Sequence, residues 1–167
     1  MSEEAVAALR AGRAVILATD TVYGVCALPE HADVVYELKG RDRSKPVALL
    51  AADIAALVEA VPGLDRSILE RYLPGPYTLV FGEIGVRVPN LPPEAAEVVR
   101  AVGVVVATSA NLADGPDPRR VEDVPKEIRD ACGAIVDAGE LPGVPSTVLD
   151  LTAPTPRVLR QGAGPPP

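Results

Sequence analysis

The four cations Lys39, Arg41, Arg43 and Lys45 form the segment of the sequence best suited to chemistry. Together with a single anion, Asp42, they fall within seven residues of a chain whose formal net charge is −7. Four like charges so close repel one another, and a bound polyanion relieves that repulsion through arginine forks and lysine point charges. The segment therefore predicts a site for a nucleotide triphosphate or similar polyanion. A solvated charged loop is the alternative.

Two other arginines lie next to apolar runs that are typical of strands. Arg87 lies inside the segment 85–89, and Arg160 follows Val158 and Leu159. A cation in such surroundings needs a carboxylate or phosphate partner. An internal acid or a bound ligand can supply that partner equally well.

Polar turns follow several apolar runs, at residues 19–21, 108–111 and 146–147. Hydroxyl and backbone N–H groups at strand ends are where open α/β sheets bind ligands. Ordinary turn and capping chemistry is the simpler explanation for any one of them. Their significance as a site therefore depends on whether the fold brings them together.

Several catalytic classes have no matching motif. The sequence contains no GxxxxGK[ST] loop, no GxGxxG fingerprint and no GxSxG motif. His31 is the only histidine, and Cys26 and Cys132 show no CxxC pairing, so we expect no metal site, Ser-His-Asp triad or disulfide framework. The chemistry that fits best relies on positioning and charge neutralisation rather than on a protein nucleophile.

Length and composition predict a single α/β domain. The chain has 167 residues, of which 48% are hydrophobic and only 3% aromatic, so Val, Leu, Ile and Ala must build the core. No apolar run approaches the ~20 residues that span a bilayer, and the N-terminus is acidic, which predicts a cytoplasmic protein. The negative net charge argues against a surface that grips nucleic acid everywhere, although one basic cleft is compatible with it.

Short apolar runs separated by turn residues predict mixed strands with interspersed helices. Val102 to Ala107 is the most apolar run and is expected to be a central strand. Residues 164–167 are expected to be a frayed tail. We expect helices near 2–11, 33–39, 64–73, 93–101 and 124–131, and another that Asp53 caps. Strands are expected near 13–18, 46–50, 77–81, 85–88, 102–107, 134–136, 147–151 and 157–159, and a second apolar piece follows the polar turn at 19–24.

Seven short motifs, taken in order, resemble the YrdC/TsaC family of threonylcarbamoyl-AMP synthases. Each is weak alone, but together they span nearly the whole chain. The resemblance implies one domain at residues 1–163, a twisted and mostly mixed sheet with flanking helices and a concave basic face, in the short form of the family. The motifs are Ala18–Gly24, Lys39-Gly40-Arg41 with Lys45-Pro46, Pro74–Leu79, Val86–Pro89, Ser109-Ala110-Asn111, Ser146-Thr147-Val148 and Leu159-Arg160.

The resemblance also implies a reaction. Enzymes of this family are nucleotidyltransferases that join L-threonine, bicarbonate or CO2 and ATP, releasing pyrophosphate and threonylcarbamoyl-adenylate for tRNA modification. Mg2+ is expected on the triphosphate. A separate tRNA threonylcarbamoyl transferase is the implied downstream partner.

Site residues are carried over position by position from the same resemblance. Thr21, Arg87 and Ser146 are expected to hold threonine, and Lys39 and Arg41 are expected to be catalytic. The expected ATP-binding residues are Lys39, Arg41, Lys45, Ser109, Asn111 and Arg160.

This sequence departs from the family pattern at two site positions. Leu50 stands where many members carry a polar residue near threonine, and Asp117 stands where serine is common beside the nucleotide. One alternative is a module of the same fold that binds double-stranded RNA or nucleotide, with at most weak tRNA contact. Another is a paralogue making a different carbamoyl-adenylate, as in the related domain of hydrogenase-maturation carbamoyltransferases.

Overall fold

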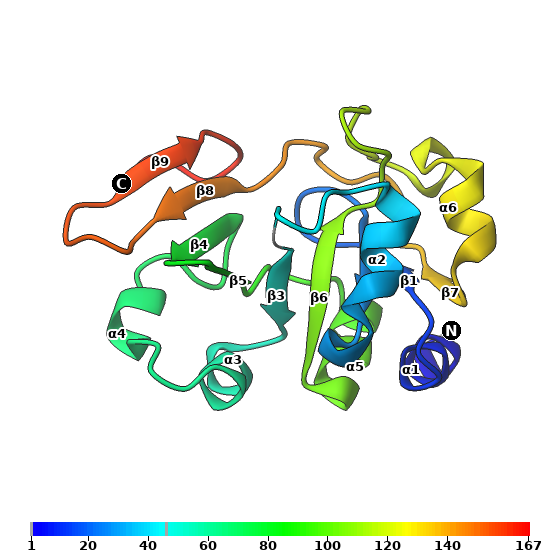
Figure 1. Ribbon diagram of the computed structural model, residues 1–167, viewed down its shortest axis with the longest axis horizontal. Coiled ribbons are helices and arrows are strands. Elements are labelled where there is room, and N and C mark those ends of the chain that lie inside the picture. The colour runs from blue at the N-terminus through cyan, green and yellow to red at the C-terminus, as the bar shows by residue number, and fades with distance from the viewer. Residues whose placement is uncertain (1, 46) are drawn as a thin grey trace.

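The computed structural model describes residues 2–45 and 47–167, which form a mixed β-sheet with flanking helices (Figure 1). The strand order is β7-β1-β2-β6-β3-β5-β4-β8-β9. Pairs β1–β7, β3–β5 and β4–β8 are parallel and the other neighbouring pairs are antiparallel, so the expected mixed α/β sheet is confirmed. The strands are β1 (Val15–Leu17), β2 (Gly24–Ala27), β3 (Ala48–Ala51), β4 (Tyr77–Phe81), β5 (Ile84–Arg87), β6 (Val104–Ser109), β7 (Ala134–Val136), β8 (Thr147–Asp150) and β9 (Arg157–Arg160).

The helices also follow the expected order. Asp53 begins α3 because its side chain accepts a hydrogen bond from the Ala56 amide at 2.8 Å. None of the helices in the described part of the chain is long and apolar enough to cross a membrane. The helices are α1 (Ser2–Arg10), η1 (Pro29–His31), α2 (Ala32–Lys39), α3 (Ile54–Ala60), α4 (Arg66–Leu69), α5 (Pro93–Val102), η2 (Val121–Asp123) and α6 (Lys126–Ala131).

Several expected elements are shorter in the structure, including two expected to begin or end at a proline. The helix expected near 64–73 is only α4, because the backbone beyond Leu69 closes tighter turns, such as Tyr72 N–H to Leu69 O at 3.1 Å. Pro74 then disfavours helical conformation at the residue before it. The strand expected from Pro46 begins at Ala48, and Pro46 itself lies outside the described residues.

One half of the sheet is covered on both faces. Helices α1 and α5 pack on one face, where Leu9 and Val98 share a buried cluster with Val105 of β6. Helices α2 and α6 pack on the other, where Val35 and Ile128 meet strands β1, β2 and β6. Strand β6 is therefore buried inside the sheet, as its apolar sequence predicts.

The half formed by β5, β4 and β8 has one covered face and one open face. Leu79, Val86 and Leu149 belong to a buried cluster that also contains residues of α3 and α4. Because side chains alternate between the faces of a strand, their neighbours face the opposite way. Thr78 and Arg87 are among those neighbours, and the open face that carries them holds the cavity described below.

The C-terminal segment forms hydrogen bonds with the sheet. Gly164 is buried, and its carbonyl accepts a hydrogen bond from Thr147 Oγ1 at 2.6 Å. The Pro165 carbonyl accepts another from the Tyr77 hydroxyl at 2.7 Å. Strands β4 and β8 thus supply hydroxyl donors for the carbonyls of the first two residues of the segment expected to be a frayed tail.

A pair of leucines tests the assignment of the core. Leu79 in β4 is fully buried, whereas Leu159 in β9 is 48% exposed. We expect Leu79→Ala to lower the free energy of unfolding by ~3 kcal/mol, because it removes buried methyl groups and leaves a cavity. Leu159→Ala is the matched control and is expected to change it by less than ~1 kcal/mol. Urea denaturation measures both, and equal losses would contradict the burial assigned to β4.

Candidate functional site

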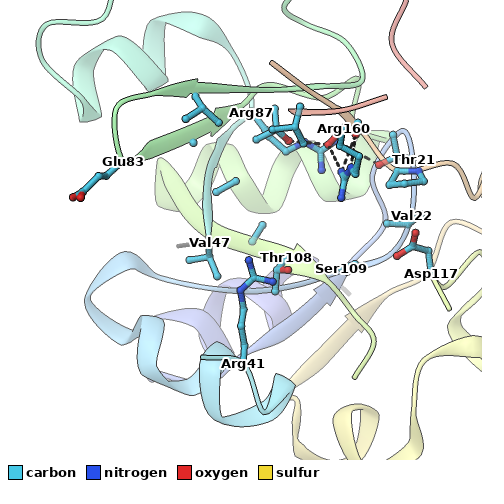
Figure 2. Close-up of a pocket in the computed structure, with 18 of the residues that line it drawn as sticks. Thr21, Val22, Arg41, Val47, Glu83, Arg87, Thr108, Ser109, Asp117 and Arg160 are labelled. Atoms are coloured by element: carbon cyan, nitrogen blue, oxygen red, sulfur yellow. Dashed lines mark hydrogen bonds between the residues drawn. The ribbon is translucent and has the colours of Figure 1, made fainter. Parts of the chain in front are cut away.

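A cavity of about 340 Å3 opens on the exposed face of β5, β4 and β8 (Figure 2). Strands β3 and β6, the turn after β1 and the loop after α2 complete its walls. Six of the nine residues carried over from the family resemblance line this one cavity, although they are spread from the first turn to the last strand. They are Thr21, Arg41, Arg87, Ser109, Ser146 and Arg160.

Arg87 extends from β5 into the cavity and is largely buried. Its Nη2 donates to Asp20 Oδ1 at 3.3 Å and to Thr21 Oγ1 at 3.4 Å, while its Nε finds no acceptor among the described residues. Burial lowers the pKa of the guanidinium, and the nearby Asp20 carboxylate opposes that effect. The side chain therefore keeps donors for a further anion.

The turn after β1 is built to hold Thr21 and Asp20 in place. Thr19 Oγ1 donates to Val22 O at 2.7 Å and accepts from the Thr21 amide at 3.1 Å. Asp20 Oδ2 accepts from the Asn90 amide at 2.9 Å. The polar turn that the sequence analysis singled out thus positions one hydroxyl and one carboxylate beside Arg87.

Arg160 and Ser146 meet across the antiparallel pair β8–β9. Arg160 Nε and Nη2 donate to the Ser146 carbonyl at 3.1 and 2.7 Å, and Nη2 also reaches Ser146 Oγ at 3.1 Å. The Ser146 hydroxyl lies 2.7 Å from Thr78 Oγ1. Sequence reasoning assigned no role to Thr78, although it lies inside one of the motifs that carry the resemblance.

Arg41 and Arg43, two residues apart, have different surroundings. Arg41 lines the cavity and donates from Nε to the Lys45 carbonyl at 3.1 Å, and Figure 2 shows its guanidinium pointing inward. Arg43 forms an ion pair with Asp33 and lies 5.7 Å from the centre of the Tyr36 ring. Lys45 is exposed and does not line the cavity. Of the four cations at positions 39, 41, 43 and 45, Arg41 is the one that lines the cavity.

Lys39 lies behind the cavity wall. It is 4% exposed, and its Nζ donates to Ser109 O at 2.9 Å and to Asn111 Oδ1 at 2.5 Å. Burial, followed by repulsion from Arg41, lowers its pKa to about 8, and Asp117 opposes that shift. Lys39 thus holds the Ser-Ala-Asn turn, so that Ser109 faces the cavity while the buried Asn111 supports it from behind.

The two residues that depart from the family pattern occupy different places. Asp117 lines the cavity and accepts from Asn111 Nδ2 at 3.3 Å, so it places a carboxylate among the cavity's cations. Leu50 is 1% exposed and belongs to the core cluster beneath α5. The apolar residue at position 50 therefore serves packing in this chain.

The arrangement as a whole suits the binding and activation of anions. Arg41, Arg87 and Arg160 approach one hollow from three separate elements, while Asp117 and Glu83 are the carboxylates among its described lining residues. Fixed cations in a partly buried cavity stabilise charge on a ligand more strongly than they do in water. Such a site can hold several anionic groups together.

Comparison with known proteins identifies relatives over nearly the whole chain. The Sua5/YciO/YrdC family model, described as "telomere recombination", matches residues 7–162. A Mycobacterium tuberculosis H37Rv protein with a provisional threonylcarbamoyl-AMP synthase name is 35% identical, over 95% of this chain and 82% of its own. The Bacillus subtilis threonylcarbamoyl-AMP synthase is 32% identical, over 95% of this chain and 52% of its own.

A solved structure shows the same fold. Pyrococcus abyssi Sua5 complexed with L-threonine superimposes with a TM-score of 0.85 at 28% identity, covering 96% of this chain and 54% of that one. This chain thus spans about half the length of the Bacillus and Pyrococcus proteins. The family match covers both the sheet and the cavity that it carries, and the chain belongs to the Sua5/YciO/YrdC family.

Proposed function

We propose that this chain synthesises L-threonylcarbamoyladenylate from L-threonine, bicarbonate or CO2, and ATP, as a nucleotidyltransferase. The observation that carries the proposal is the convergence of Arg41, Arg87 and Arg160 on one cavity. Relatives at 32% and 31% identity carry the name threonylcarbamoyl-AMP synthase. The reaction joins several anions, which is the task for which these cations are arranged.

The chemistry needs no protein nucleophile. The neutral threonine nitrogen bonds to the carbon of CO2 and loses a proton to solvent, giving an N-carboxylate. From bicarbonate, the C–OH bond breaks instead and that proton leaves with the hydroxide as water. A carboxylate oxygen then attacks the α-phosphorus of ATP, and the bond to pyrophosphate breaks. Arg87 holds the threonine carboxylate beside Thr21 and Ser146, while Arg41 and Arg160 neutralise charge on the phosphates.

Lys39 supports the nucleotide through the Ser-Ala-Asn turn. Because its Nζ fixes Ser109 O and Asn111 Oδ1, it sets the position of the Ser109 hydroxyl. Its charge also contributes to the field at the phosphates from behind the wall. Lys45, which lies at the surface, is a weaker candidate for ATP contact than Arg41.

Mg2+ belongs with the nucleotide in this proposal. The described residues contain no group of three or more His, Cys, Asp or Glu side chains placed to hold a metal ion. Mg2+ binds readily through phosphate oxygens and few protein ligands, so the triphosphate brings it. Asp117 is the cavity-lining carboxylate whose charge acts on Arg160 and on Lys39.

The product would pass to a separate tRNA threonylcarbamoyl transferase in the cytoplasm. Direct contact with tRNA or double-stranded RNA remains a prediction. An RNA-binding role predicts salt-dependent RNA affinity without ATP turnover. The related carbamoyl-adenylate reaction predicts turnover that does not depend on threonine.

Pyrophosphate release tests the proposal directly. The purified chain is incubated with ATP, Mg2+ and bicarbonate, with and without L-threonine, and with L-serine as the matched amino acid. We expect release that depends on threonine and exceeds that seen with serine. ATP binding without threonine-dependent release would instead favour a paralogue or a binding module.

A further inference from the structure

Thr78 is a cavity-lining hydroxyl to which the reaction scheme above gives no role. It lies in β4, and its Oγ1 is 2.7 Å from the Oγ of Ser146, which is 68 residues away in the chain. Both hydroxyls line the cavity, and Ser146 is 4% exposed. The contact is therefore a part-buried polar pair that lines the site.

Counting hydrogens shows that this pair keeps one donor. Two hydroxyl groups carry two hydrogens, and the bond between them uses one. Ser146 Oγ is also an acceptor for Arg160 Nη2, which supplies its own hydrogen. Neither hydroxyl has another acceptor among the described residues, so one O–H hydrogen is left to bond to a group inside the cavity.

The surroundings select the chemistry of that group. Two guanidinium groups lie near the pair, because Arg160 bonds to Ser146 and Arg87 is close enough to Arg160 for their charges to interact. A hydroxyl donor beside two cations recognises an anionic oxygen better than a neutral one. Arg87 Nε, which lacks an acceptor among the described residues, adds a second unused donor nearby.

We propose that Thr78, together with Ser146, donates a hydrogen bond to a carboxylate-type oxygen of the substrates. That oxygen belongs either to the threonine carboxylate or to the carboxylate derived from bicarbonate. The inference rests on the proposed function and adds Thr78 to its substrate-binding residues.

The two groups on the Thr78 side chain can be tested separately. Its Cγ2 methyl packs against Gly85, where an added Cβ would lie 3.5 Å from it. Thr78→Val keeps that methyl and removes the hydroxyl, whereas Thr78→Ser keeps the hydroxyl and removes the methyl. A purely structural role for Thr78 therefore predicts greater damage from serine, and the proposal predicts greater damage from valine.

The experiment measures KM for L-threonine, bicarbonate and ATP in wild type and both variants. We expect Thr78→Val to raise the KM of one carboxylate substrate about tenfold, with the KM of ATP changed less than about twofold. Thr78→Ser should remain close to wild type. If only the KM for threonine rises, the oxygen that Thr78 binds belongs to the threonine carboxylate. If only the KM for bicarbonate rises, that oxygen belongs to the carboxylate derived from bicarbonate.

Three outcomes would overturn the proposal: no change in Thr78→Val, an equal loss in Thr78→Ser, or a uniform rise in all three KM values. Calorimetric titration with L-threonine in bicarbonate buffer makes the same comparison without turnover. Wild type that binds threonine but releases no pyrophosphate counts against the proposed function. Where turnover is absent, equal affinity of wild type and Thr78→Val for both L-threonine and bicarbonate counts against the role of Thr78.

Discussion

Arg41→Ala is expected to weaken ATP binding about 100-fold while leaving the fold intact. The arginine lines the cavity from the loop after α2, outside the sheet and its core clusters. Losing its hydrogen bonds to phosphate oxygens removes about 3 kcal/mol of binding free energy. Calorimetric titration with ATP and Mg2+ gives the affinity, and thermal unfolding checks the fold.

Arg43→Ala is the matched control for that variant. It removes the same side chain two residues away, from a position where the guanidinium pairs with Asp33 and stacks near Tyr36. Exposed ion pairs contribute little, so we expect ATP affinity within about twofold of wild type. If both variants lose affinity equally, the loop acts through its general charge. Normal affinity in a folded Arg41→Ala variant would remove Arg41 from the site.

Arg87→Ala is expected to raise KM for L-threonine about 100-fold and to change KM for ATP much less. The substitution removes the forked donor expected to bind the threonine carboxylate, an interaction of about 3 kcal/mol. It also leaves the carboxylate of Asp20, whose side chain is only 13% exposed, without its ion-pair partner. A loss of stability is therefore expected as well.

A second substitution separates binding from folding. Arg87→Lys keeps the positive charge beside Asp20 but loses the planar fork, so it is expected to fold while still losing most of its threonine affinity. Arg157→Ala, at an exposed position on β9, is the arginine control and should leave both KM values unchanged. Equal increases in KM for threonine and ATP would show that Arg87 supports the whole site rather than the amino acid.

The sequence predicts the sheet well because each strand is a short apolar run bounded by turn residues. The run at 102–107 corresponds to β6 (Val104–Ser109), buried between β2 and β3, and the polar turn at its end faces the cavity through Ser109. Asp53 likewise caps a helix where expected. These features depend on residues close together in the chain, which is why local patterns indicate them.

The contacts that shape the site could not be predicted in the same way. Arg41 and Arg43 have the same residue type, and only the fold decides which of them faces the cavity. Lys39 was expected to bind ATP, but its buried amine bonds to Ser109 and Asn111, which lie 70 and 72 positions further along the chain. The pairing of Thr78 with Ser146 depends on the parallel register of β4 and β8.

Neighbouring side chains of β4 and β5 face the core and the cavity in turn, and this restricts how the protein can vary over evolutionary time. Leu79 and Val86 fill the core from the same strands whose adjacent residues, Thr78 and Arg87, face the cavity. Inserting or deleting one residue within β4 would exchange Leu79 with Thr78 between core and cavity, and the same change within β5 would exchange Val86 with Arg87. Changes of specificity in such a protein must therefore arise by substitution at alternate positions, or in the loops, where length can change freely.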